Sequence, residues 1–338
     1  MNVNPFYYGG TIENEHFCNR VQELQNLKND IQAGLNVLIY APRRFGKTSL
    51  VLKTLKELQK SNDVKYVFLD MMNIDTLDEF INKYFNLLAK NLEQPTDKVV
   101  KFFKSIVKIR PNINVNFDVN GTPNFSLSFS QDEINQTLQD VLNIPLSFSK
   151  RGIKIVVVFD EFQEALNLEL ESKLRSVIQL HSNKISYIFM GSKKSLLHQM
   201  FLDKNRPFYK SVKHFKIQEI QKSDWVQFIQ TKFTTTKKSV TTDVIDEIVD
   251  ITRGFPYYTQ QFAYEMWNIT DKKADIVLFK RALKIILERE EDLFRVELEN
   301  LTPNKKKALK ALVQNDMIDN NSDGYYFQDP LFEYWYKN

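Results

Sequence analysis

The stretch Val37-Leu-Ile-Tyr-Ala-Pro-Arg-Arg-Phe-Gly-Lys-Thr-Ser49 places a phosphate-binding loop between an apolar strand and the start of a helix. In a P-loop, backbone N–H groups wrap the phosphates, the lysine reaches the β and γ oxygens, and the Ser/Thr hydroxyl goes to Mg²⁺. Alanine replaces the first glycine of the pattern at Ala41, which is tolerated if φ is negative there. The sequence therefore predicts a site for ATP and Mg²⁺, with Thr48 as a metal ligand and these nucleotide ligands: Pro42, Arg43, Arg44, Phe45, Gly46, Lys47, Thr48 and Ser49.

A second acidic strand supports hydrolysis. Residues 154–161 read Lys-Ile-Val-Val-Val-Phe-Asp-Glu, a β-branched run that ends in two carboxylates. In this Walker B arrangement Asp160 would hold Mg²⁺ through water, and Glu161 would orient or deprotonate the attacking water. The alternative is a buried strand whose end carries acidic residues at a turn, and the P-loop upstream makes this alternative the weaker one.

Composition favours a soluble intracellular enzyme. With 338 residues, 43% of them hydrophobic, the chain is long enough to bury a large core and to divide into domains. The single Cys18 argues against a disulfide-built secreted protein. Neither a signal segment nor an apolar run near the ~20 residues of a membrane span is present, so we expect a cytoplasmic protein without a membrane partner. The net charge of +4 neither requires nor excludes nucleic acid.

Strand and helix patterns alternate along the chain, as in an α/β nucleotide-binding domain. After a strand expected at 185–190, Ser192 occupies the edge of the sheet where a polar residue can sense the γ-phosphate or position water, although a turn serine is the plainer interpretation. The Asn120-Gly121 pair within 112–129 indicates an inserted β-hairpin. The other expected elements are helices at 20–34, 77–92, 133–146 and 169–179 and a strand at 64–70.

Several blocks, in order along most of the chain, resemble the prokaryotic AAA-type ATPases of the STAND and origin-recognition-related clade. They are Phe17-Cys-Asn-Arg-Val-Gln-Glu-Leu24, the P-loop, Val156-Val-Val-Phe-Asp-Glu-Phe-Gln-Glu164, Ile188-Phe-Met-Gly-Ser192, Asn205-Arg-Pro-Phe-Tyr209 and Arg253-Gly-Phe-Pro-Tyr-Tyr-Thr-Gln260. The resemblance implies an α/β P-loop NTPase with a parallel sheet core, a helical lid and a winged-helix-like C-terminus.

The resemblance also implies further site residues. Phe17, Arg20 and Glu23 match a box that contributes to the adenine pocket, and Pro256 matches a lid proline that touches adenine. Without a nucleotide role, Arg20 and Glu23 would be a three-apart pair on a solvated helix face, and Pro256 would only start a helix. Arg206 would be either an arginine finger for a neighbouring subunit or a local structural residue. Arg253 would be a candidate phosphate contact of the sensor 2 type, although this clade often lacks that function.

The C-terminus departs from the family pattern. One helix at 303–314 passes almost directly into a hairpin-like segment at 317–327, which leaves no room for a recognition helix that could enter the major groove. The basic cluster Lys305–Lys307 is expected to lie on a solvated face. The chain also carries an aromatic tail, which is too apolar to lie in water, so we expect it to pack on the lid helices or to form a partner surface. Its residues are Tyr325, Tyr326, Phe327, Phe332, Tyr334, Trp335 and Tyr336.

These observations favour an ATP-dependent switch whose state a partner protein, or self-association, reads. The alternative is a DNA-binding ATPase acting in replication, transposition or defence, with nucleic acid bound without sequence specificity. The expected domains are the nucleotide-binding domain at 1–215, the lid at 216–300 and a shortened winged-helix-like module at 301–338.

Overall fold

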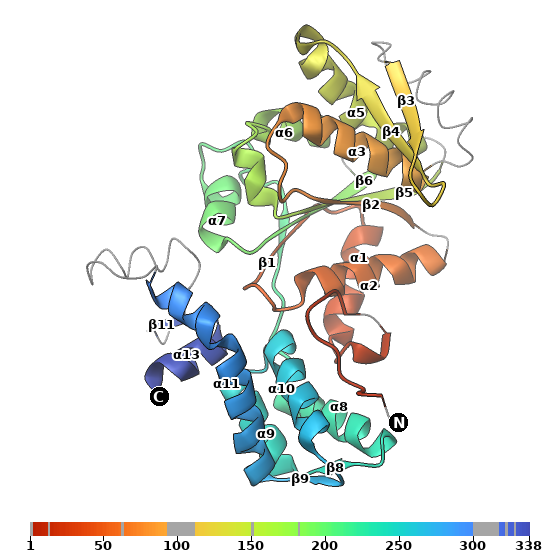
Figure 1. The fold of residues 1–338 in the computed structure, drawn as a ribbon. Helices are drawn as coiled ribbons and strands as arrows, with labels where there is room; N and C mark the ends of the chain where they lie inside the picture. The colour runs from red at the N-terminus through yellow and green to blue at the C-terminus, as the bar shows by residue number, and fades with distance from the viewer. Residues whose placement is uncertain are drawn as a thin grey trace. The chain divides into compact units, whose positions relative to one another are not determined.

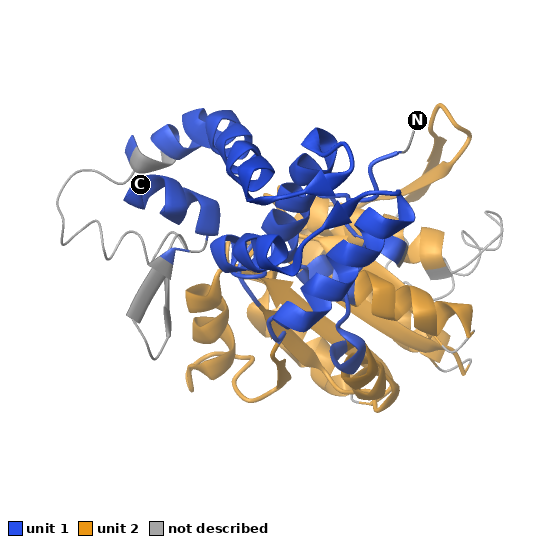
Figure 2. Cartoon of the chain, turned by 90° about the horizontal axis from the view of Figure 1, so that it is seen from below, with its two compact units in different colours: residues 1–23, 41–50, 217–338 blue, residues 24–40, 51–216 orange. Residues whose placement is uncertain are grey.

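The computed structural model describes residues 3–12, 14–61, 64–92, 112–149, 152–181, 183–299, 318–321, 324–327 and 329–338. Contacts within the chain divide it into two compact units, which Figure 2 shows in two colours. Unit 2 comprises residues 24–40 and 51–216, and unit 1 comprises residues 1–23, 41–50 and 217–338. The division near residue 216 lies close to the expected end of the nucleotide-binding domain, but the P-loop segment is grouped with the C-terminal part. The three expected domains therefore stay a prediction.

Unit 2 is built on a parallel five-stranded sheet. Its strands follow the order β2 (Val64–Asp70), β5 (Lys154–Asp160), β6 (Ile185–Gly191), β1 (Val37–Tyr40) and β7 (Lys213–Phe215). The central strands β5 and β6 are buried along almost their whole length, as expected for strands that are covered on both faces. Because all strands are parallel, their carboxyl ends share one edge of the sheet, where α/β proteins place their ligands.

Helices cover both faces of this sheet (Figure 1). One face is covered by α1 (Val21–Gln32) and α2 (Lys47–Lys60), and the other by α3 (Leu77–Leu92), α5 (Ile134–Ser149) and α6 (Glu171–Leu180). Residues of α7 (Lys194–Leu202) belong to the same hydrophobic core as α3, α5 and α6. That core is rich in aromatic rings, and Phe159 packs within about 6 Å of several of them, the side chains of Phe80, Tyr84, Phe162, Tyr187 and Phe189. The α/β fold with a parallel core is therefore confirmed.

Two expected elements are present with somewhat different bounds. The helix expected at 169–179 begins at Glu171, after a short 3-10 helix η3 (Phe162–Leu166). Glu169 has a left-handed φ of 52°, which a residue inside a right-handed helix does not adopt. The expected hairpin consists of β3 (Asn112–Phe117) and β4 (Pro123–Ser128). Its loop is longer than Asn120-Gly121 alone, and within it the Asp118 N–H donates to the Thr122 carbonyl at 3.0 Å.

The hairpin is fastened to α3 through side-chain amides. The N–H groups of Phe125 and Leu127 in β4 donate to the side-chain oxygens of Asn86 and Asn82, at 3.0 and 2.7 Å. Phe125 and Leu127 themselves are buried in the core of unit 2. The hairpin therefore extends the helical layer rather than the main sheet.

Unit 1 contains α8 (Lys222–Thr235), α9 (Thr242–Thr252), α10 (Pro256–Ile269) and α11 (Ile276–Glu299), with a short parallel pair β8 (Ser239–Val240) and β9 (Lys273–Ala274). The expected terminal hairpin is present as β10 (Ile318–Asn321) and β11 (Gly324–Phe327), followed by α13 (Pro330–Lys337). The helix expected at 303–314, with its cluster Lys305–Lys307, lies outside the described residues. A winged-helix assignment stays a prediction.

Part of the aromatic tail packs on α11. Phe332 is 1% exposed, and its ring and that of Trp335 each lie 5.6 Å from the ring of Phe294 in α11. Tyr336, by contrast, is 56% exposed. Within the described ranges, no helix has both the length and the apolar character needed to cross a bilayer.

His181 is a buried titratable group in the core of unit 2. Its Nδ1 lies 2.7 Å from the Tyr187 hydroxyl and its Nε2 lies 2.9 Å from Oδ1 of Asn143. Burial, with a smaller contribution from Lys184, lowers the pKa of His181 from 6.5 to about 4. The folded state therefore holds this imidazole neutral at a pH where the unfolded chain would protonate it.

This pKa difference predicts an acid-sensitive stability. Because the unfolded state binds more protons between pH 6.5 and 4, the free energy of unfolding should fall as pH falls through that window. For this single group the loss between pH 7 and pH 5 is about 2 kcal/mol. Urea unfolding of the parent and of His181→Gln at both pH values measures it, since the variant should lose less stability than the parent. Equal losses would show that His181 does not cause the effect.

Candidate functional site

The P-loop joins β1 to α2 with two residues in the left-handed region. Arg44 has a φ of 64° and Gly46 a φ of 89°, whereas Ala41 is not among the residues with positive φ. The condition under which alanine can replace the first glycine is therefore met. The amide of Leu50 donates to the Gly46 carbonyl at 3.0 Å, so the helix begins directly behind the loop. The start of a helix is a position at which proteins commonly bind anions.

Lys47 lies over its own loop. Its Nζ donates to the Ala41 carbonyl at 2.9 Å and to the Pro42 carbonyl at 3.3 Å, and the residue is 7% exposed. Of the other loop residues, Arg43 is exposed and Thr48 is partly buried. The ammonium is thus held against the backbone of the loop.

Arg20 is buried against the P-loop. Its guanidinium donates to the Phe45 carbonyl at 3.1 Å and to the Gln218 carbonyl at 2.7 Å, and it pairs with Glu23 at 3.4 Å. The residue is only 4% exposed and has a left-handed φ of 70°. The alternative of a pair on a solvated helix face was therefore wrong: this arginine joins the N-terminal box to the P-loop.

The Gly-x-Pro motif lies beside the same loop. A Cβ placed on Gly46 would lie 3.9 Å from Cγ of Pro256, the first residue of α10. The rings of Phe45 and Phe255 pack edge to face at 5.0 Å. Pro256 thus starts a helix, and a side chain added at Gly46 would lie within van der Waals distance of it. The partly buried Phe17 lies in the same unit.

Sequence reasoning missed several partners of the P-loop. The backbone N–H of Ile12 donates to the Ser49 hydroxyl at 2.9 Å, and no motif marks Ile12. Arg44 donates to the Tyr258 hydroxyl at 2.7 Å and pairs with Asp329 at 3.2 Å, and its guanidinium lies 4.6 Å from the centre of the Tyr257 ring. Tyr257 and Tyr258 follow the Gly-x-Pro motif directly, which is the only signal that could have found them.

A second group of predicted site residues lies in unit 2, where strands β5 and β6 end. The Ser192 hydroxyl donates to Oε2 of Glu161 at 3.1 Å, and the Gln163 side-chain amide donates to the same oxygen at 2.6 Å. Glu161 has a φ of 49°, and its N–H donates to Oδ1 of Asp160 at 3.0 Å. The structure therefore brings Asp160, Glu161 and Ser192 together, and it adds Gln163, which the sequence did not single out.

Gly191 makes room for Gln163. A Cβ placed on Gly191 would lie 2.2 Å from Oε1 of Gln163, a distance that real Cβ atoms do not show. The amide that holds Glu161 therefore occupies the space that any larger residue at the end of β6 would need. The φ of Gly191 is not positive, so the requirement is for space alone.

The two remaining arginine candidates have local partners. Arg206 pairs with Glu171 at 2.8 Å, and burial raises the pKa of the Glu171 carboxyl, in opposition to the arginine. Arg253 donates to the Phe327 carbonyl at 2.8 Å and forms an ion pair with Glu333 of α13. The choice between the two expected roles of Arg206 stays a prediction, and Arg253 contacts the C-terminal segment.

The predicted metal ligands Thr48 and Asp160 have side chains of the kind that bind Mg²⁺ together with a nucleotide. Among the described residues, no group of three or more His, Cys, Asp or Glu side chains could hold a metal ion by themselves. Mg²⁺ in phosphoryl-transfer sites is held by one or two protein oxygens together with phosphates and water. The Asp160 carboxylate, 8% exposed, and the Thr48 hydroxyl are oxygen donors of this kind.

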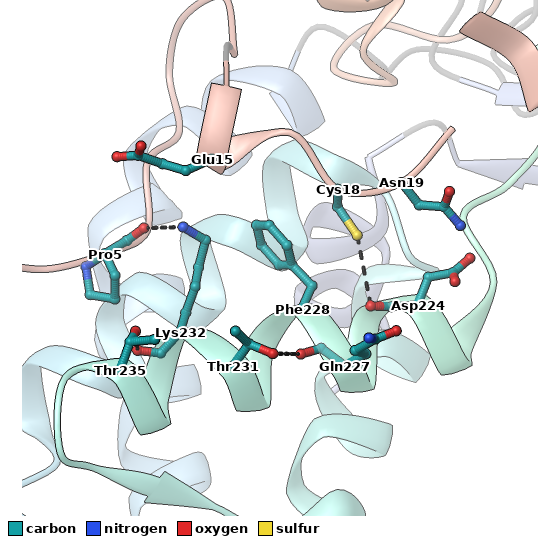
Figure 3. Close-up of a pocket in the computed structure, with 10 residues that line it drawn as sticks. All are labelled: Pro5, Glu15, Cys18, Asn19, Asp224, Gln227, Phe228, Thr231, Lys232 and Thr235. Atoms are coloured by element: carbon teal, nitrogen blue, oxygen red, sulfur yellow. Dashed lines mark hydrogen bonds between the residues drawn. The ribbon is translucent and has the colours of Figure 1, made fainter. Parts of the chain in front are cut away.

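A cavity of about 620 Å³ lies elsewhere in unit 1, between the N-terminal segment and α8 (Figure 3). It contains no P-loop residue, so its size alone does not mark the nucleotide site. Lys232 donates to the Pro5 carbonyl at 2.7 Å, and the Cys18 thiol contacts the Asp224 carbonyl at 3.8 Å. Burial raises the pKa of Cys18 to about 12, which keeps this thiol protonated and unreactive.

Curated relatives are archaeal ATP-binding proteins. The chain is 30% identical over 189 residues to the ATP-binding protein MJ1076 of Methanocaldococcus jannaschii, a match that covers 55% of this chain and 45% of that protein. It is 27% identical over 191 residues to MJ1006 of the same organism, covering 55% and 44%. The chain thus matches less than half the length of these relatives.

Solved structures share the fold over nearly the whole chain, at identities that show the fold alone. The Walker-type ATPase PABY2304 of Pyrococcus abyssi superposes with a TM-score of 0.68 at 19% identity, covering 96% of this chain and 97% of that one. The Aeropyrum pernix ORC1 protein in complex with DNA gives a TM-score of 0.53 at 11% identity, covering 96% and 94%.

The family model described as an ATPase domain predominantly from Archaea matches residues 17–262. This match runs from Phe17 of the predicted adenine box, through the P-loop and the Asp160-Glu161 pair, into α10. It therefore includes the site residues found in both units. The chain belongs to this family of ATPase domains found predominantly in Archaea.

Proposed function

We propose that this protein is an ATP-binding and ATP-hydrolysing switch of the AAA type, whose nucleotide state is read by a partner protein or by another copy of the chain. One observation carries the proposal: the P-loop packs on the residue that precedes α10, because the rings of Phe45 and Phe255 meet edge to face at 5.0 Å. A change at the loop is thereby passed to a helix, which is what a nucleotide switch requires. A STAND-type role is part of this proposal.

We assign a residue to each step of the proposed ATP hydrolysis. Lys47 and the first amides of α2 would bind the β and γ phosphates. Mg²⁺, when bound, would neutralise the charge that develops on the phosphates. The Glu161 carboxylate would take the proton of the attacking water, and Ser192 and Gln163 fix the direction in which its Oε2 points. Arg206 would stabilise the sheet edge through Glu171.

Removing the P-loop ammonium tests nucleotide binding. A charge-assisted contact of this kind is worth about 1.5–3 kcal/mol, so Lys47→Ala should weaken ATP binding at least about tenfold. Calorimetric titration measures it, with Lys53→Ala as the matched control, since Lys53 lies on the same helix and pairs with Glu57. Equal affinity of Lys47→Ala and the parent would contradict the P-loop assignment.

Neutralising Glu161 separates binding from chemistry. Glu161→Gln should keep ATP affinity while turnover falls by about 10²-fold or more, because a general base is lost. Phosphate release measures turnover, and Glu164→Gln in the same 3-10 helix is the control, since Glu164 pairs with Lys193 instead. Turnover of Glu161→Gln within threefold of the parent would remove Glu161 from the reaction.

A DNA-acting ATPase is the second candidate. It is favoured by the shared fold with the ORC1 protein solved in complex with DNA, and by the terminal hairpin β10–β11 with the helix α13 behind it. If the C-terminal module reads no sequence, duplex binding should be weak, about 10⁻⁴–10⁻⁶ M at physiological salt, and should weaken steeply as salt rises. Selection from a random duplex library should then enrich no motif. A reproducible motif that is lost on deleting residues 301–338 would favour the DNA-acting role over the switch.

A further inference from the structure

The last helix of the chain begins at an aspartate that has two tasks. Oδ1 of Asp329 accepts the N–H groups of Leu331 and Phe332, both at 3.0 Å, and so caps α13. Oδ2 of the same carboxylate pairs with the Arg44 guanidinium at 3.2 Å. The two oxygens thus join the start of the terminal helix to the middle of the P-loop, across 285 positions of sequence.

Arg44 is held from several sides. Besides Asp329, its guanidinium donates to the Tyr258 hydroxyl and stacks on the Tyr257 ring. Tyr258 is buried, and burial raises the pKa of its hydroxyl, so this group stays protonated. Arg44 also has a left-handed φ of 64°, a conformation that a residue with a side chain keeps only when its surroundings impose it.

We infer that Asp329 is a positioning residue for the nucleotide site: through Arg44 it holds the P-loop in its phosphate-binding conformation. The inference rests on the nucleotide binding proposed above. By linkage, a contact that favours the nucleotide-bound loop is itself favoured by nucleotide. Binding of ATP and docking of α13 should therefore strengthen each other, and the end of the chain becomes the part that a partner can read.

The helix α13 has a second anchor that serves as a control. Glu333 pairs with Arg253 and with Lys337, and neither residue belongs to the P-loop. Glu333→Gln therefore loosens the docking of α13 without touching Arg44. Asp329→Asn, by contrast, keeps an N-cap, because asparagine caps helices about as well as aspartate, and removes the charge that faces Arg44.

The test is a double-mutant cycle on the full chain, with a non-hydrolysable ATP analogue and Mg²⁺ as the probe. Asp329→Asn should weaken binding about three- to fivefold, the size expected for a partly exposed ion pair. In an Arg44→Ala background the same substitution should have no effect. Glu333→Gln, which leaves the Arg44–Asp329 pair in place, should weaken binding less than Asp329→Asn does.

A second readout follows the linkage directly. Hydrogen exchange of the α13 amides, Leu331 to Trp335, should slow on adding the analogue to the parent, and this slowing should be lost in Asp329→Asn. Unchanged affinity of Asp329→Asn, tighter binding, or an equal loss in the Arg44→Ala background would each overturn the inference alone. A parent that binds no nucleotide at all would overturn the proposed function, and the inference with it.

Discussion

A buried guanidinium holds the nucleotide-binding loop in place. Arg20 is almost fully removed from water, and a charge in that position is stable only if its hydrogen bonds are made. Its donors reach the carbonyl of Phe45 in the P-loop and the carbonyl of Gln218, where the chain enters the lid helices. Three segments that are distant in sequence therefore depend on one side chain. Loss of Arg20 would remove a charge and also take away the hydrogen bond that the carbonyl of the buried Phe45 accepts from it.

Around this anchor, the P-loop keeps a backbone that its own sequence does not favour. Arg44 lies in the left-handed region, where glycine is the usual residue. The aromatic pair Tyr257 and Tyr258 and the carboxylate of Asp329 offset that cost by holding the side chain on three sides. The conformation of the loop thus depends on residues outside it, which lie at the starts of α10 and α13.

Much of the fold could be predicted because its signals are local. Strand β5 is a run of β-branched residues, and α3 has helical spacing, so both were placed within a residue or two of their observed bounds. The bounds differ where backbone geometry decides: Glu169 takes a left-handed φ that delays α6, and Asp118 pairs with Thr122 within the hairpin loop. The Arg44–Asp329 contact spans 285 positions and carries no motif, so it could not be predicted from local pattern. Gln163 was missed for a different reason: its role depends on the side-chain conformation that lets its amide donate to Glu161, and a sequence does not show side-chain conformation.

The missing side chain at Gly191 limits which substitutions this ATPase could accept. A β-strand tolerates alanine at most positions, and nothing about a strand end would suggest otherwise. Here one added methyl group would meet Oε1 of Gln163 and displace the amide from the Glu161 carboxylate. Gly191→Ala would then leave the sheet intact and still alter the direction in which Oε2 of Glu161 points. The orientation of the Glu161 carboxylate therefore depends partly on the absence of a Cβ atom at Gly191.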